Sequence, residues 1–226
     1  MKIEIVTGDS LAWLKKQKAL SYDVASFSPP YGKGRQFLFN VASKDWTQRF
    51  AEWAVELSRV CRVWGVDFTQ LVDDKTKGCI PFTERLVVDL HDAGVHLFDR
   101  WVMYKTATRP MRGNKALSAF EFFLLFSAEP AKVPLNEGRW LTAFKEESAR
   151  AVDFNHSPKL GQRAYSQAFP RAIIQAHCPP KGRVLDAFSG SGTTGLVAKS
   201  LGCSFTGVEL DPEVADLSRK VLGIVR

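Results

Sequence analysis

The residues Arg183–Gly195, which read RVLDAFSGSGTTG, decide the fold that this sequence predicts. Arg183–Ala187 has the length and the apolar character of a buried strand, and Thr193–Leu201 has a helical pattern that ends at Gly202. Between them, Gly190-Ser191-Gly192-Thr193-Thr194-Gly195 has the spacing G-x-G-x-x-G. A strand that enters a helix through such a turn is typical of nucleotide-binding α/β sheets. The segment therefore predicts an α/β fold with mainly parallel strands.

An acidic residue follows at the distance that such a loop requires. Glu209 ends the next predicted strand, Ser204–Glu209, 19 positions after Gly190. A carboxylate there can accept hydrogen bonds from two ribose hydroxyls. A glycine loop alone is often a plain tight turn, but the strand, the helix and the acid together predict an adenosine-ribose site.

The position of this unit in the chain limits the choice of ligand. Only the 44 residues from Arg183 to Arg226 are available from the first strand onward, too few for the sheet of a dinucleotide domain. The rest of the sheet must come from the N-terminal part, so the chain is circularly permuted relative to a nucleotide-binding fold that begins with this loop.

The charge of the loop indicates the cofactor. Asp186, at the end of the predicted strand, would attract the cationic amino and sulfonium groups of S-adenosylmethionine and would be a poor neighbour for a pyrophosphate. The loop therefore favours S-adenosylmethionine, with S-adenosylhomocysteine as the product. The residues expected to contact it here are Asp186, Phe188, Ser189, Gly190, Ser191, Gly192, Thr193, Thr194 and Glu209.

The remaining elements alternate between strand and helix. Predicted strands are Lys2–Val6, Asp23–Phe27, Arg62–Leu71, His96–Lys105 and Phe120–Phe126, the last two close enough to form an antiparallel pair. Predicted helices are Ser10–Gln17, a segment from Trp46 to Val60, one from Pro81 to Gly94, Pro170–Cys178, and one capped by Asp211 with Pro212 at its first position. Together these elements predict a doubly wound, mixed seven-stranded sheet.

Composition excludes several classes of protein. With 226 residues the chain is one ordinary domain, and its net charge of +7 suits a polyanionic partner, although cytosolic enzymes also carry such a surplus. The N-terminal residues lack the apolar core of a signal peptide, and no apolar run approaches membrane-spanning length. Four scattered cysteines without a CxxC pair predict neither a zinc cluster nor disulfides. We expect a cytoplasmic enzyme without a metal.

A rigid turn, Ser28-Pro29-Pro30-Tyr31, follows the strand Asp23–Phe27 at the edge of the sheet where ligands bind. On the simplest interpretation, the turn does no more than end a strand, and Tyr31 packs on the core. Alternatively, its rigidity aims acceptors at the exocyclic amine of cytosine or adenine, whose lone pair is delocalised into the ring. If the Ser28 oxygen and the Pro29 carbonyl accept both N–H groups, the nitrogen moves toward tetrahedral geometry and its lone pair is freed. Tyr31 would stack on a base flipped out of the duplex.

These motifs and their order resemble the beta-group DNA amino-methyltransferases, in which a (D/N/S)-P-P-(Y/F/W) motif precedes the glycine motif. The resemblance covers nearly the whole chain. It implies that Gly8-Asp9 is the short motif whose acid meets the cofactor adenine, and that Ser28, Pro29, Pro30 and Tyr31 are catalytic. Gln167-Ala168-Phe169-Pro170 is similar to the motif whose helix encloses the cofactor, which adds Phe169 and Pro170 to the site, although Tyr165-Ser166 stand where the family has His-Pro.

The family also has a target-recognition insertion, which we place at residues 129–162, where helical and strand periodicity fails; it is unusually short. Residues 1–128 and 163–226 would then form the catalytic domain. Basic residues that leave the sheet on the catalytic side are expected to contact the phosphates of double-stranded DNA, although a basic loop is often only a solvated face. They are Lys33, Arg35, Lys105, Arg109, Arg112 and Lys115.

The sequence favours cytosine N4 as the target atom, because Ser-Pro-Pro-Tyr accompanies cytosine in most of the family that it resembles. Adenine N6 is the alternative, followed by an RNA methyltransferase and by a catalytically silent nucleic-acid-binding subunit. None of the four cysteines follows a proline, which argues against the covalent mechanism of ring-carbon methylation. A paired restriction endonuclease and a prokaryotic or phage origin would accompany such an enzyme.

Overall fold

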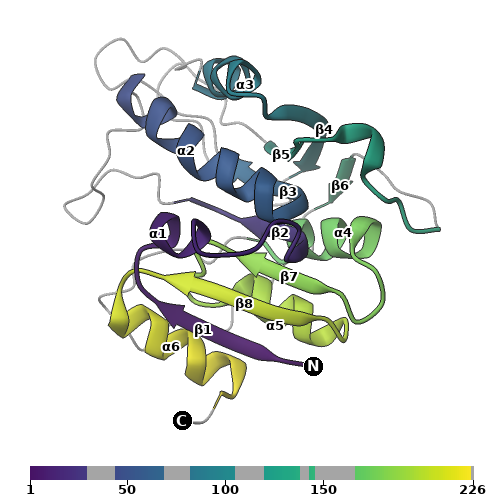
Figure 1. Ribbon diagram of the computed structural model, residues 1–226. Coiled ribbons are helices and arrows are strands. Elements are labelled where there is room, and N and C mark those ends of the chain that lie inside the picture. Colours follow the sequence, from purple (N-terminus) through teal and green to yellow (C-terminus); the bar gives the residue numbers. More distant parts are fainter. Residues whose placement is uncertain (30–43, 69–81, 105–119, 138–142, 146–165, 225–226) are drawn as a thin grey trace, which may run out of the picture.

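The computed structural model describes residues 1–29, 44–68, 82–104, 120–137, 143–145 and 166–224 (Figure 1). Its strands are β1 (Ile3–Thr7), β2 (Tyr22–Phe27), β3 (Cys61–Phe68), β4 (His96–Tyr104), β5 (Phe120–Ser127), β6 (Ala143–Lys145), β7 (Arg183–Asp186) and β8 (Ser204–Glu209). Its helices are α1 (Ser10–Leu14), α2 (Lys44–Val60), α3 (Phe82–Asp92), the 3-10 turn η1 (Pro130–Lys132), α4 (Ala168–His177), α5 (Thr193–Ser200) and α6 (Pro212–Leu222).

All described strands belong to one sheet, in the order β1-β8-β7-β2-β3-β5-β4-β6. Neighbouring strands run parallel except β5, which is antiparallel to both β3 and β4. The predicted doubly wound mixed sheet is confirmed, and so is the antiparallel pair of β4 and β5. The seven predicted strands are all present. An eighth, β6, adds three residues to the edge of β4 and was not predicted, because three residues carry no readable alternation.

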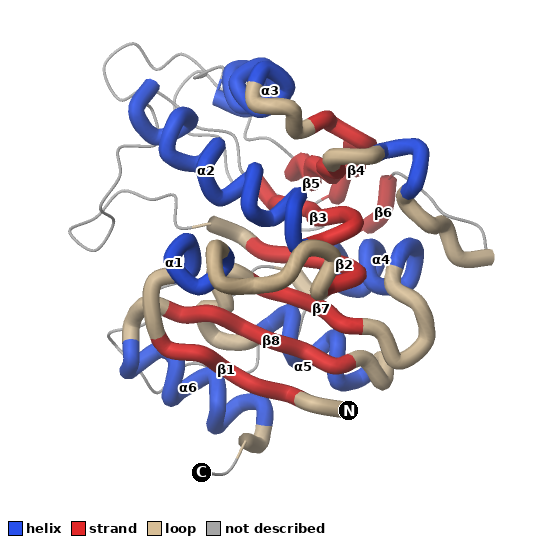
Figure 2. The backbone as a smooth tube through the Cα atoms, in the orientation of Figure 1, coloured by secondary structure: helices blue, strands red, loops and turns tan. Residues whose placement is uncertain are grey.

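Helices cover both faces of the sheet, as Figure 2 shows. The core on one face is formed by α1, α2 and α3, which contribute Leu14, Phe50, Ala54, Leu57, Val60, Phe82, Leu86 and Leu90. The core on the other face is formed by α4, α5 and α6, which contribute Phe169, Ile173, Ile174, Val197, Ala198, Ala215 and Leu222. Apolar residues at helical spacing therefore face the sheet from both sides, as the amphipathic patterns predict.

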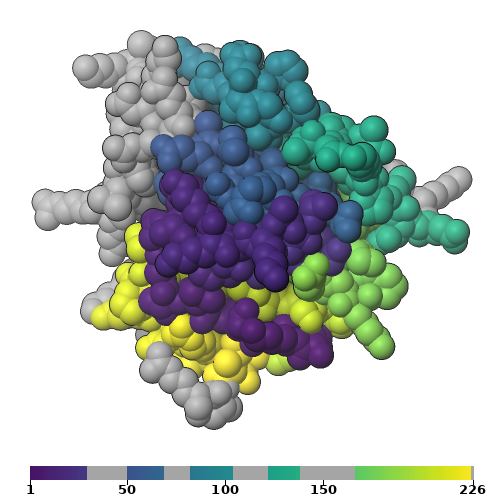
Figure 3. Space-filling view, in the orientation of Figure 1, coloured from purple at the N-terminus to yellow at the C-terminus, as the bar shows by residue number. Residues whose placement is uncertain are grey.

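The C-terminal unit β7-α5-β8 lies in the middle of the sheet, between the N-terminal strands β1 and β2. Figure 3 shows the N-terminal and C-terminal residues, purple and yellow, as one continuous surface. The Arg219 guanidinium of α6 fastens the edge strand β1, donating to the Ile5 carbonyl at 2.9 Å and to Thr7 Oγ1 at 2.7 Å. This arrangement is the permuted order that the length of the C-terminal unit predicts.

Part of the expected insertion packs on the C-terminal end of α4. The Asn136 side-chain amide donates to the carbonyls of Gln175 and Cys178, at 2.7 and 2.8 Å, and its backbone N–H donates to the Ala176 carbonyl. The buried His177 ring donates from Nδ1 to the Pro134 carbonyl at 2.7 Å, and burial lowers the pKa of His177. The bonds from Asn136 satisfy carbonyls that the helix end leaves unpaired. The domain boundaries at residues 129 and 162 stay a prediction.

Within the described part of the chain, no helix combines the length and the apolar character needed to cross a membrane.

Gly65 of β3 provides a test of the packing between the sheet and α4. A Cβ at this position would lie 2.5 Å from the Phe123 ring and 2.9 Å from Ile173. We expect Gly65→Ala to lower the free energy of unfolding by about 1–3 kcal/mol through overpacking. Denaturant unfolding measures this loss, and a free energy of unfolding equal to that of wild type would contradict this account of the packing.

Candidate functional site

The predicted site residues gather where the chain diverges from adjacent parallel strands. The chain after β7 enters α5 on one face of the sheet, whereas β2 is followed along the chain by α2, which packs on the other face. Such a switch point leaves a crevice at the carboxyl ends of the two strands, where open α/β sheets bind ligands. Ser28 follows β2, Asp186 ends β7 and Glu209 ends β8, so all three lie at this edge.

Asp186 is a buried carboxyl group at the centre of this edge. Its Oδ1 accepts the Phe188 N–H at 2.9 Å, and the hydroxyl of Thr194 is a second polar neighbour. Burial raises the pKa of Asp186 to about 7; the neighbouring Thr194 hydroxyl and the Phe188 N–H oppose this shift, and the nearby Glu209 charge adds to it. A carboxylate whose charge is disfavoured by burial gains most from a cationic ligand group. Asp186 therefore suits the positively charged end of S-adenosylmethionine.

Glu209 holds the glycine loop against the end of β8. Its Oε2 accepts the Gly190 N–H at 2.8 Å, and its Oε1 accepts the Asp211 N–H at 3.0 Å. The Ser189 N–H donates to the Val208 carbonyl at 2.9 Å, which continues the pairing of β7 and β8 into the loop. Each carboxylate oxygen has two lone pairs, so Glu209 can brace the loop and still accept two ribose hydroxyls.

The glycines of the loop differ in what they accommodate. Gly190 has a φ of +50°, and a Cβ there would meet nothing closer than the Phe188 carbonyl at 3.8 Å. A Cβ on Gly192, whose φ is +88°, would lie 2.6 Å from Ser218 Oγ of α6. One on Gly195 would lie 2.6 Å from the Phe205 ring. The second and third glycines thus let α5 approach α6 and the sheet, and Gly190 leaves open backbone toward a ligand.

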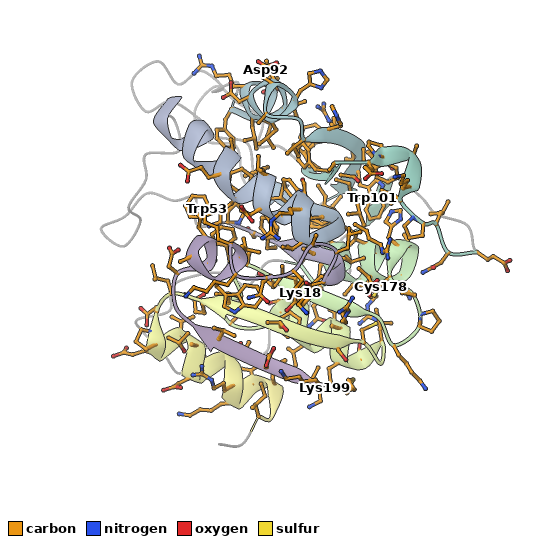
Figure 4. All side chains as sticks on the ribbon, viewed as in Figure 1. Lys18, Trp53, Asp92, Trp101, Cys178 and Lys199 are labelled. Atoms are coloured by element: carbon orange, nitrogen blue, oxygen red, sulfur yellow. The ribbon has the colours of Figure 1, made fainter. Side chains whose placement is uncertain are left out.

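An aromatic cluster flanks the loop. The Phe188 ring lies 5.4 Å from that of Phe27 and 5.9 Å from that of Trp53. Trp53 lies where α2 passes α1 (Figure 4), and its Nε1 donates to Ser10 Oγ at 3.0 Å. The sequence places Trp53 only within the predicted helix from Trp46 to Val60, because the helical pattern does not distinguish a core residue from one beside a ligand.

Asp9 and the first turn of α1 lie next to Glu209. The Gly8 N–H donates to the Glu209 carbonyl at 2.8 Å, which fixes the end of β1 beside the end of β8. Asp9 caps α1, its Oδ1 accepting the Ala12 N–H at 2.7 Å. Leu210, 59% exposed, adds an apolar surface to this edge that the sequence did not single out. Its only signal was an apolar residue between two acids.

The helix that begins near Phe169-Pro170 supports the site from the sheet face opposite α1 and α2. The Phe169 ring is fully buried and stacks on Phe123 with centroids 4.5 Å apart. Pro170 is also buried. Phe169 therefore contacts the core with its ring, and the contact of Phe169 and Pro170 with a cofactor stays a prediction.

The turn Ser28–Tyr31, which is predicted to be catalytic, is described only in its first half. Ser28 is half-buried and Pro29 is buried, directly after β2. Pro30 and Tyr31 lie outside the described residues, as do the basic residues expected to contact DNA, namely Lys33, Arg35, Lys105, Arg109, Arg112 and Lys115. The described half joins the cofactor loop through Thr194, whose hydroxyl donates to the Ser26 carbonyl at 3.1 Å.

Within the described residues, no group of three or more histidine, cysteine or acidic side chains is arranged to hold a metal ion. The groups that the edge of the sheet does present are carboxylates, open backbone and aromatic rings. This donor set fits S-adenosylmethionine, which has a cationic end, a ribose and an apolar adenine.

The chain belongs to the DNA methylase family of N6 and N4 amino-methyltransferases, whose model matches residues 22–220. It is 26% identical, over an alignment 251 positions long, to the DNA adenine methyltransferase YhdJ of Escherichia coli K12, covering 97% of this chain and 82% of that protein. It is 29% identical to the type II methyltransferase M.SmaI of Serratia marcescens, over 65% of this chain and 53% of that protein.

Solved structures share the fold. The PvuII DNA methyltransferase, which is cytosine-N4-specific, matches with a TM-score of 0.80 and 18% identity, covering all of this chain and 87% of the other. M1.HpyAVI in complex with S-adenosylmethionine matches with a TM-score of 0.72 and 22% identity, covering 98% of this chain and all of the other. The protein is therefore an S-adenosylmethionine-dependent DNA amino-methyltransferase, as the order of its motifs predicts.

The raised pKa of Asp186 predicts how cofactor binding depends on pH. A carboxyl with a pKa of about 7 is charged at pH 8 and mostly neutral at pH 6, so attraction to a cationic ligand fades as the pH falls. We expect wild type to bind S-adenosylmethionine more tightly than Asp186→Asn at pH 8, and this advantage to shrink about tenfold by pH 6. Calorimetric titration gives the ratio of the two dissociation constants, from which the cofactor's own titration cancels.

Asp92→Asn, an exposed change at the end of α3, is the control and should follow wild type at both pH values. A ratio between wild type and Asp186→Asn that stays constant from pH 8 to pH 6 would remove Asp186 from the cofactor site.

Gly192 gives a second test, of the packing beneath the loop. Gly192→Ala combines a left-handed φ with the overlap on Ser218 Oγ, and should lower the free energy of unfolding by about 1–3 kcal/mol. In a Ser218→Ala background the overlap disappears and the next contact is Leu222 at 3.5 Å, so the cost should fall toward the conformational part alone. Gly190→Ala, which has open space, is the control. An equal cost in both backgrounds, measured by denaturant unfolding, would contradict the packing role.

Proposed function

We propose that this enzyme methylates cytosine N4 at a specific site in double-stranded DNA. The observation that carries the proposal is the position of Ser28-Pro29 directly after β2, beside the β7 loop and tied to it by the Thr194–Ser26 bond. A serine there is an uncharged acceptor, which suits the more electron-rich amine of cytosine. The PvuII enzyme, named as cytosine-N4-specific, matches over the whole chain and supports this choice.

The proposed mechanism needs no covalent intermediate. Ser28 Oγ and the Pro29 carbonyl accept the two N–H groups of the flipped base, and Tyr31 stacks on its ring. Bound S-adenosylmethionine supplies an electrophilic methyl group. Asp186 would hold the cationic end of the cofactor at the neighbouring strand, and Glu209 would hold its ribose. The loop from Phe188 to Thr194 and Asp9, with Phe169 and Pro170 behind them, would complete the pocket. Orientation of two reactants in this way removes much of the entropic barrier to transfer.

The proposal also assigns the DNA contacts. Residues 129–162 would be the target-recognition insertion of a catalytic domain formed by residues 1–128 and 163–226, and the bonds of Asn136 to α4 would fix its start. The six basic residues predicted from the sequence would contact backbone phosphates. The likeness to M.SmaI, named a type II methyltransferase, supports a paired restriction endonuclease.

Adenine N6 is the second candidate, favoured by the match to YhdJ over 97% of the chain. Both amines present a similar fork of two N–H groups, so the same acceptors serve either base.

Product analysis decides between the two bases. We expect DNA treated with the enzyme and S-adenosylmethionine, digested to nucleosides and weighed, to contain N4-methylcytosine. Ser28→Ala should lower the rate at least about a hundredfold and leave cofactor affinity within a few-fold, because it removes one preorganised acceptor. N6-methyladenine without N4-methylcytosine would show that adenine is the target, and 5-methylcytosine would contradict the mechanism as well.

A further inference from the structure

Asp67 is a buried acid in a strand that is otherwise almost entirely apolar. It is the penultimate residue of β3, and only 3% of it is exposed. Burying a carboxylate is costly unless the group is hydrogen-bonded or paired, so its presence in the core is unfavourable for packing alone. Its position is the carboxyl end of the strand, the edge of the sheet at which the catalytic turn lies.

The strand register puts Asp67 beside Ser28. β2 and β3 are parallel, and Phe27 pairs with Val66, so the next residues along the two strands are Ser28 and Asp67. Neighbouring strands are about 4.8 Å apart, and paired residues on them point to the same face. A side chain at Gly65 would point toward Phe123 and Ile173, on the α4 side of the sheet. Asp67 lies two residues further along β3, so its side chain is on the same face, and it pairs with Phe123 on β5.

A serine at the catalytic position has a requirement that a carboxylate does not. Its hydroxyl has one proton and two lone pairs, whereas an ionised aspartate only accepts. To accept the amine N–H, the Ser28 oxygen must direct its own proton elsewhere. A carboxylate on the adjacent strand would accept that proton in a charge-assisted hydrogen bond, the strongest type available to a hydroxyl.

We propose that Asp67 is a positioning residue that acts through Ser28, holding the hydroxyl as an acceptor toward the target amine and receiving its proton during methyl transfer. This inference rests on the proposed role of Ser28 and applies to either base. In this arrangement Asp67, a buried neighbour, supplies the negative charge that Asp-Pro-Pro-Tyr enzymes have in the motif itself.

The step balances. As the amine nitrogen bonds to the methyl carbon, the carbon–sulfur bond breaks and its electron pair stays on sulfur. The nitrogen then carries one proton in excess, which passes to the Ser28 oxygen while the Ser28 hydroxyl proton passes to the Asp67 carboxylate. Release of that proton to solvent restores both side chains.

The test is a comparison of Asp67→Asn with wild type in single-turnover methylation of DNA. Asn is isosteric and neutral, so we expect the rate of transfer to fall about a hundredfold, with KM for DNA and the dissociation constant of S-adenosylmethionine within about threefold of wild type. Asp67→Glu keeps the charge and should retain more of the rate than Asp67→Asn. Asp99→Asn is the matched control, because Asp99 accepts from Trp101 Nε1 in β4, and its rate should equal that of wild type.

A double-mutant cycle separates this role from a structural one. If Asp67 acts through Ser28, then Ser28→Ala with Asp67→Asn should be no slower than Ser28→Ala alone, within about threefold. Multiplying rate losses, or an Asp67→Asn protein that keeps wild-type turnover, would overturn the proposal. If circular dichroism and cofactor titration show that Asp67→Asn does not fold, Asp67→Glu takes its place in the cycle. A lower rate for Asp67→Glu in the wild-type background, with no further loss when it is added to Ser28→Ala, supports the relay. The identity of the methylated base tests the proposed function separately.

Discussion

The buried carboxyl of Asp186 is the group on which the rest of the site depends. It accepts the Phe188 N–H and lies beside the Thr194 hydroxyl, which donates to the Ser26 carbonyl. These contacts join the glycine loop, the first turn of α5 and the strand that leads to Ser28. Because burial raises the pKa of Asp186 from 3.8 to about 7, the contribution of this group to stability is lost as the pH rises through that range. The ionised group therefore lowers the stability of the protein at neutral pH relative to acid pH, a cost that functional sites often carry.

The regular elements could be predicted from the sequence because each has a local physical signal. The helix pattern from Pro81 to Gly94 appears as α3, and Gly94 has the left-handed φ of a helix-ending glycine. Asp211 caps α6, accepting from the N–H groups of Glu213 and Val214, as the Asp-Pro pair indicates. β6 could not be predicted, since three residues pair with β4 through the fold and not through any pattern of their own.

The candidate site likewise contains some residues that have a local signal in the sequence and others that do not. The placement of Asp186, Gly190 and Glu209 at one edge of the sheet could be predicted from their spacing, because a loop between a strand and a helix has a fixed geometry. The packing role of Gly192 could not be predicted. It depends on Ser218 of α6, which lies 26 positions later in the chain and lies beside the loop only in the folded protein. Trp53 and Leu210 were not singled out by the sequence, because their residue types and spacing are those of ordinary core and surface positions.

The sheet and the cofactor loop, which adenine and cytosine methyltransferases share, do not by themselves determine which base is methylated. A relative named as an adenine methyltransferase aligns with 97% of the chain, and a structure named as cytosine-N4-specific superposes on all of it. The two amines present the same pair of N–H donors, so acceptors at the end of β2 and a cofactor at the end of β7 serve both. What differs between the bases is the size of the ring system and the donors and acceptors on its edges, which Ser28 and Pro29 would not contact in their proposed role as acceptors for the amine. Apart from the uncharged acceptor that Ser28 offers, discrimination of the base would come from side chains that approach the ring edges from other segments, and these segments can change without altering the sheet.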